Sequence, residues 1–124
     1  MQVEIPVSIG ELVDKITILE IKHSLITQAS KLVNIDRELK LLKQRLQALN
    51  LDSLLDAEQT ELHTVNRRLW DIENFKRNCE RCQKFDSEFV EAARMVYIFN
   101  DQRAEIKRRI NDLVGSEIRE EKSY

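Results

Sequence analysis

The chain has 124 residues, enough for one domain with its own hydrophobic core, and we expect a single domain over residues 1–124. Hydrophobic residues make up 42% and charged residues 34%, with only two glycines and one proline, a composition that favours long helices over sheet. The 20 lysines and arginines nearly balance the 22 aspartates and glutamates, so the basic excess typical of a nucleic-acid-binding protein is missing and no such partner is predicted.

Residues 2–7 alternate apolar and other side chains, with Val3, Ile5 and Val7 on one side, which is the pattern of an extended segment. Pro6 has no backbone N–H and restricts this segment to an edge or an isolated position. One strand cannot form a sheet. We therefore expect an extended N-terminal arm that lies on a helical bundle and pairs with the C-terminal tail or with another subunit.

Residues 9–26 carry the pattern of a helix around which the others pack. Ser8 and Glu11 have the spacing of a capping box, which places the helix start at Ile9. A second apolar row on another side predicts contacts on two faces. The main row recurs every three or four positions and consists of Ile9, Leu12, Ile16, Leu19, His23 and Ile26.

Residues 27–30 predict a break, with Thr27 or Ser30 as the cap of a second helix. Packing of this helix back on the first through a short turn is the simplest arrangement. Its apolar residues have the three-four spacing of a coiled coil and are Leu32, Ile35, Leu39, Leu42, Leu46 and Leu49.

Residues 50–53 predict the next connection, with Asp52 or Ser53 capping a third helix that fades near residues 83–85. Asp86 or Ser87 caps a fourth helix, and Gly115 has the place of its C-terminal stop. The residues predicted to face the core are Leu62, Val65, Leu69, Ile72 and Cys79 on the third helix and Phe89, Ala92, Ala93, Val96, Phe99, Ile110 and Val114 on the fourth. The predicted fold class is all-α, an antiparallel four-helix bundle built of two long helical hairpins with a short extended N-terminal arm.

Polar side chains converge on the predicted bundle interior from three helices. On the fourth helix they stand amid the apolar face, where an unpaired cation is costly. Complementary residues lie on the first and third helices, with Asp14 as a further candidate. The candidate ligand-binding cluster is Glu20, His23, Asn66, Glu73, Asn100, Arg103, Lys107 and Asn111.

Two interpretations of this cluster stay open. In the first, Glu20 and Glu73 neutralise Arg103 and Lys107 in a structural network that fixes how the helices pack. In the second, the cluster is a pocket for a small anion, in which Arg103 grips a carboxylate or phosphate with its planar fork of donors. The sequence alone does not separate a structural network from a binding pocket.

Cys79 and Cys82 form an isolated Cys-x-x-Cys pair. A structural zinc site needs four ligands and a redox motif needs a βαβ context, so we predict no metal, no disulfide and no other cofactor, with Cys79 in the core. No complete catalytic motif occurs, and whether the chain is an enzyme is left open.

Three separated blocks, IPVSIGELVDKITILEIK, LWDIE and the C-terminal segment from Asn100 to Glu-Glu-Lys-Ser-Tyr, resemble a family of short bacterial and phage proteins. That family is catalogued as a domain of unknown function, and the resemblance covers essentially the whole chain. It implies no activity, cofactor or site that can be carried over.

We infer a function from the apolar helix faces of the chain, because no catalytic motif is available to indicate one. The chain has more apolar helix faces than one hairpin covers and no apolar run of the roughly 20 residues that span a bilayer. No signal peptide is predicted. We expect a cytoplasmic, non-catalytic interaction or assembly module that forms a homodimer without a membrane partner. The alternative is a protein or enzyme that binds a small anionic metabolite.

Overall fold

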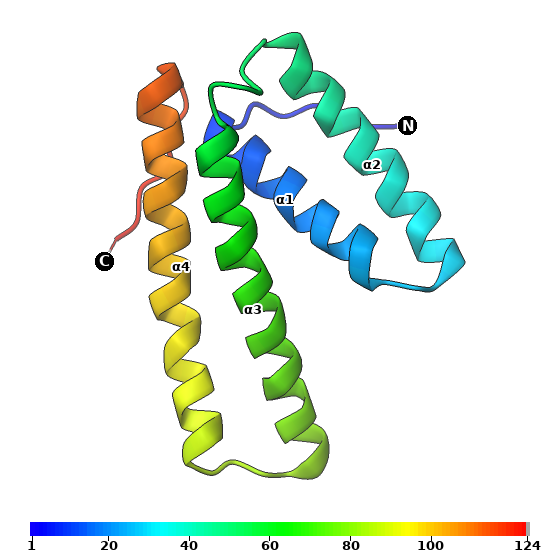
Figure 1. Ribbon diagram of the computed structural model, residues 1–124, viewed down its shortest axis with the longest axis vertical. Helices are drawn as coiled ribbons and strands as arrows, with labels where there is room; N and C mark the ends of the chain where they lie inside the picture. Colours follow the sequence, from blue (N-terminus) through cyan, green and yellow to red (C-terminus); the bar gives the residue numbers. More distant parts are fainter. Residues whose placement is uncertain (124) are drawn as a thin grey trace.

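The computed structural model describes residues 1–123 and contains four helices with no strand in that range, which confirms the predicted all-α class (Figure 1). The helices are α1 (Ile9–Leu25), α2 (Ala29–Ala48), α3 (Asp56–Cys82) and α4 (Ser87–Val114). None of these helices is both long enough and apolar enough to cross a membrane.

Helix α1 is the centre of the fold, as its two apolar faces predict. It packs against all three other helices, while α2 packs within the described residues against α1 alone. Helices α3 and α4 lie side by side over their whole length, and α1 covers only the half of this pair that lies away from the α3–α4 loop (Figure 1). The other half of the α3–α4 hairpin projects beyond the end of α1.

The helix ends confirm some of the predicted caps. Ser8 accepts a hydrogen bond from the Glu11 backbone N–H (3.0 Å), and Asp86 accepts from the Glu88 and Phe89 backbones. Gly115 adopts φ 65°, a left-handed conformation that glycine tolerates without strain, and ends α4 at the predicted place.

The predicted caps of α2 and α3 are wrong. Gln28 and Leu55 stand at the N-cap positions, and neither makes a side-chain capping bond. Leu55 is fully buried, and its N–H bonds to the backbone carbonyls of Leu51 and Asp52. Tertiary packing and a preceding turn therefore fix the start of α3 in place of a polar cap.

The hydrophobic core lies where α1 meets the other helices. Its buried residues include Leu12, Val13, Ile16 and Leu19 of α1, Ile35, Leu39 and Leu46 of α2, Leu62 and Val65 of α3, and Ile106 and Ile110 of α4. Cys79 is buried farther along α3, as predicted. Leu69 and Phe99, also predicted to face the core, are half-buried and pack against it. The predicted core residues of α3 and α4 that lie between these two, Cys79 apart, are half-buried or exposed. Leu49 of the second predicted row is also exposed.

Both ends of the chain lack regular secondary structure. Residues 1–7 are exposed, and an ion pair between Glu4 and Arg45 (2.9 Å) joins them to α2. After Gly115 the chain turns back and follows α4, with Ser116 buried at the turn (Figure 1). We call residues 117–123 the C-terminal tail.

Candidate functional site

Asp14 on α1 is the centre of a polar cluster between α1, α3 and α4. Its side chain is completely buried, and Arg103 of α4 binds both carboxylate oxygens (Nη2–Oδ2 2.7 Å, Nε–Oδ1 3.1 Å). Asn66 of α3 donates to Asp14 Oδ1 and to the Thr17 hydroxyl, each at 2.8 Å. This carboxylate therefore joins three helices, and its buried charge is both paired and hydrogen-bonded.

Lys107 extends the cluster to the C-terminal tail. Its Nζ lies 2.5 Å from Glu11 Oε2, 3.1 Å from Glu120 Oε2 and 4.0 Å from Asp14 Oδ2. Ser8 donates to the other oxygen of Glu120 at 3.3 Å. The tail carboxylate is thus bound by a lysine of α4 and the N-cap hydroxyl of α1.

The contacts of the cluster favour the charged forms of Arg103, Lys107 and Glu120. Burial alone lowers the pKa of Arg103, but the hydrogen bond and charge of Asp14 outweigh burial and raise the pKa above its ordinary value. Burial likewise lowers the pKa of Lys107, but the bonds of Lys107 to Glu11 and Glu120 have the larger effect, so its pKa lies above the ordinary value. For Glu120, burial raises the pKa, but the bond and charge of Lys107 together with the bonds to Glu11 and Ser8 outweigh burial, so the pKa of Glu120 lies below its ordinary value.

Gly10 allows α1 to approach α4 closely beside the cluster. A Cβ at this position would lie 2.6 Å from the Lys107 carbonyl oxygen and 3.0 Å from Asn111 Oδ1. The Gly10 N–H donates to that same Asn111 oxygen at 2.8 Å. Asn111 therefore accepts from an α1 backbone N–H that the helix itself leaves unbonded.

Five of the eight predicted cluster residues lie at this contact: Asn66, Asn100, Arg103, Lys107 and Asn111. Asn100 Oδ1 lies at the edge of the site, 3.4 Å from Arg103 Nη1. These positions were found from the sequence because they interrupt apolar faces at helical spacing.

The other three predicted residues lie elsewhere. Glu20 faces Lys43 of α2 at 3.6 Å, and Glu73 pairs with Lys76 of its own helix at 3.4 Å. His23 is half exposed, with Nε2 4.0 Å from Asp36 of α2. The predicted neutralisation of Arg103 and Lys107 by Glu20 and Glu73 is therefore wrong.

The true acidic partners are Asp14, Glu11 and Glu120. Asp14 was only a further candidate, Glu11 had been assigned to the helix cap, and Glu120 belongs to a tail with no periodic pattern. Whether these carboxylates reach the two cations depends on the point along each helix axis at which α1 crosses α4. Helical periodicity shows which face of a helix a residue lies on, but it does not show this point of contact. The one available signal was that Glu11 and Asp14 lie three residues apart on one face of α1.

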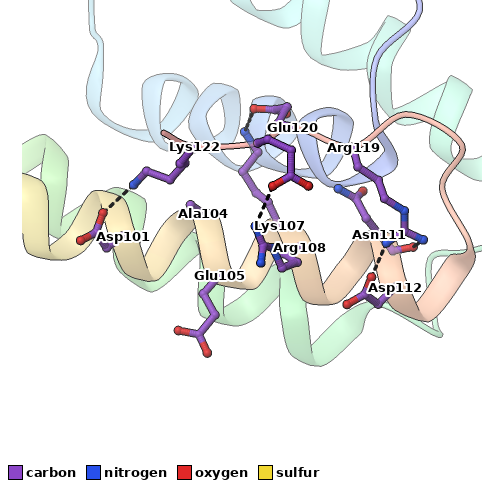
Figure 2. A pocket seen from close by; sticks show the side chains of 11 residues that line it. Asp101, Ala104, Glu105, Lys107, Arg108, Asn111, Asp112, Arg119, Glu120 and Lys122 are labelled. Atoms are coloured by element: carbon purple, nitrogen blue, oxygen red, sulfur yellow. Dashed lines mark hydrogen bonds and ion pairs between the residues drawn. The ribbon is translucent and has the colours of Figure 1, made fainter. Parts of the chain in front are cut away.

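A cavity of about 580 Å³ lies between α4 and the tail, beside this cluster. Figure 2 shows Arg119, Glu120 and Lys122 of the tail meeting Asp112, Lys107 and Asp101 of α4. Glu121 also pairs with Arg108 at 3.2 Å. The cavity thus combines charges of both signs. Residues 1–123 contain no group of three or more histidine, cysteine, aspartate or glutamate side chains placed to hold a metal ion.

Comparison with known proteins adds a family but no activity. The model of a family of unknown function, DUF6165, matches residues 1–124. Comparisons with curated proteins and with solved structures gave no match.

Proposed function

Because the chain belongs to the family of unknown function DUF6165, we propose its function from its own structure: a non-catalytic module that assembles as a homodimer. The observation that carries this proposal is the projecting half of the α3–α4 hairpin, residues 70–98, which we call the distal hairpin. Cys79 is its one buried residue, while its apolar residues include four aromatic side chains of α3 and α4 that are half-buried or exposed. They are Trp70, Phe75, Phe89 and Tyr97.

The face that holds α1 continues along the distal hairpin. Val96 and Phe89 lie seven and fourteen positions before Arg103, so helical spacing places them on the face of α4 that meets α1. Trp70 and Glu73 lie four and seven positions after Asn66 on α3, on the corresponding face. We call the face formed by Trp70, Glu73, Phe89 and Val96 the stripe. Beyond the end of α1, no helix covers the stripe within the described residues.

A second copy of the chain is the occupant that the charges favour. The distal hairpin is nearly neutral, so two copies do not repel each other. Arg77 is exposed on α3 one turn after Glu73 and has no ion-pair partner in residues 1–123. In a two-fold pairing, contacts are reciprocal, so Glu73 of each copy can face Arg77 of the other. Two hairpins joined in this way make a four-helix arrangement in which each stripe is covered.

The polar cluster supports a structural role more than a catalytic one. Arg103 and Lys107 each have carboxylate partners within the chain, and Asp14 is completely buried. General acid–base or nucleophilic catalysis needs a group within hydrogen-bond reach of a substrate. The network joins α1 to α3 and α4 and so fixes the scaffold that presents the distal hairpin.

Sedimentation of the Val96→Glu variant tests the proposed dimer. The wild-type chain is expected to sediment as a dimer at micromolar concentration and Val96→Glu as a monomer, because a buried, unpaired carboxylate opposes association. Val33→Glu is the matched control, since Val33 is 57% exposed on α2 and lies off the stripe. A monodisperse wild-type monomer, or equal loss of dimer in both variants, would contradict the proposal.

A charge exchange tests the two-fold geometry separately. Arg77→Glu is expected to weaken the dimer by placing like charges opposite each other, while Glu73→Arg combined with Arg77→Glu is expected to restore it. Circular dichroism must show unchanged helix content in both variants. If the double variant forms no more dimer than the single variant, Glu73 and Arg77 do not face each other across the interface.

A further inference from the structure

The tip of the distal hairpin, residues 78–91, is acidic and partly apolar. It contains four acidic and two basic side chains. Glu80 and Glu88 are exposed, and neither side chain has an ion-pair partner in residues 1–123. Phe85 is 49% exposed and contacts Phe89 edge-on, with 5.2 Å between the ring centroids. The tip therefore presents unpaired carboxylates together with exposed aromatic surface.

The connection between α1 and α2, residues 22–31, which we call the α1–α2 turn, has the opposite charge. With the neighbouring helix segments, over residues 20–43, it contains five lysines and arginines and three acidic residues. Lys22 and Lys31 have no ion-pair partner in the described part of the chain. Leu25 is half-buried and lies outside the core. The α1–α2 turn therefore complements the tip in charge and also offers apolar surface.

The proposed two-fold dimer, on which this inference rests, brings the two regions together. Reciprocal contacts between Glu73 and Arg77 require the two α3 helices to run antiparallel. Glu80 lies seven positions after Glu73 and so on the same face of α3. In this register, Glu80 of one copy lies level with Trp70 of the other.

The C-terminal part of α1 lies beside the stripe at this level. Asn66, one turn before Trp70, donates to the Thr17 hydroxyl of α1 at 2.8 Å. From Thr17, α1 continues in the direction of α3 as far as Leu25, while its axis moves away from α3 (Figure 1). The α1–α2 turn therefore stands next to the stripe, at the level that the tip of the other copy reaches.

We propose that the α1–α2 turn is a docking surface for the tip of a second copy. Glu80 of one copy faces Lys22 and Lys31 of the other, and Phe85 covers Leu25. A second copy fits better than an unrelated partner, because the two-fold operation that covers the stripe also brings each tip to the other α1–α2 turn. The dimer then has two reciprocal charged contacts outside the stripe.

Charge reversal on either side of this contact tests it by sedimentation equilibrium at low ionic strength, where charge interactions are least screened. Lys31→Glu and Glu80→Lys are each expected to raise the dimer dissociation constant at least fivefold, since the two-fold symmetry repeats every substituted contact. An equimolar mixture of the two variants is expected to form more dimer than either variant alone, because both contacts of the heterodimer join opposite charges. Circular dichroism must show unchanged helix content in both variants.

Arg37→Glu is the matched control and is expected to leave the dimer unchanged. Arg37 is also an exposed α2 cation without an ion-pair partner in residues 1–123, but it lies one turn after Val33, on the side of α2 away from α1. Equal effects of Lys31→Glu and Arg37→Glu on a wild-type dimer, or a mixture with no more dimer than either variant alone, would overturn this contact and leave the proposed dimer intact. A wild-type monomer would overturn both.

Discussion

The Asp14 side chain is out of contact with solvent, and Arg103 and Asn66 donate directly to its oxygens. The pairing itself adds little net stability, since burying two charges costs nearly what their attraction returns. Removing one partner has a much larger effect, because the remaining charge loses its compensation. The network therefore makes the position of α1 specific.

Replacing Arg103 with Met is expected to lower the free energy of unfolding by about 3–5 kcal/mol, because the buried Asp14 would lose its closest cation and keep only Asn66 and the more distant Lys107 (4.0 Å). Adding Asp14→Asn to Arg103→Met is expected to recover much of that loss. Urea denaturation of both variants measures the change, and Glu73→Gln serves as a control with little effect on monomer stability. Additive losses in the double variant would contradict direct coupling between Asp14 and Arg103.

Replacing Gly10 with Ala is expected to destabilise the chain by about 1–3 kcal/mol, although alanine favours helix more than glycine does. The new Cβ would lie 2.6 Å from the Lys107 carbonyl oxygen, and a backbone atom cannot relieve the clash by a change of rotamer as a side chain can. Gly115→Ala provides a contrast, because no atom lies within 4 Å of its added Cβ and its cost comes from φ 65° alone. Thermal unfolding compares the two. A stabilised Gly10→Ala chain would contradict the close approach.

At the scale of helices, the sequence predicts the fold well because local signals and periodicity agree. The range of α1 and the stop at Gly115 follow from capping residues and apolar spacing. The starts of α2 and α3 could not be predicted from capping residues, because no side-chain cap is present and the packing of residues such as Leu55 determines where α3 begins. For the candidate site, periodicity finds the α4 cations but assigns Glu20 and Glu73 as their partners, since it says nothing about how far α1 reaches along α4.

The tail is expected to loosen from α4 in acid. The pKa of Glu120 lies below its ordinary value of 4.5, so its ion pair stabilises the chain above that pH and is lost as the pH falls through the lowered pKa. Wild type should exceed Glu120→Gln in unfolding free energy at pH 7 by under about 1 kcal/mol, since the Glu120 side chain is 53% exposed. Denaturation of both chains from pH 7 to 3 measures this difference, and a gap that widens in acid would contradict it.

For the whole molecule, the helices carry two separate surfaces. The distal hairpin leaves aromatic side chains uncovered, which we propose a second copy covers, while the cavity under the tail is lined by charges of both signs. The polar cluster lies between them and holds α1 in place against α3 and α4. The distal hairpin and the cavity under the tail are therefore separate parts of one scaffold.

The packing of α2 on α1 alone has a consequence for motion. We expect α2 to open locally while the Asp14 network stays intact, because α2 packs on α1 and contributes no residue to that network. In native-state hydrogen exchange, the amides of α2 are expected to exchange through a lower-energy opening than those of α1, whose exchange needs the whole scaffold to unfold. Identical opening energies for the two helices would mean that the chain opens as one cooperative unit.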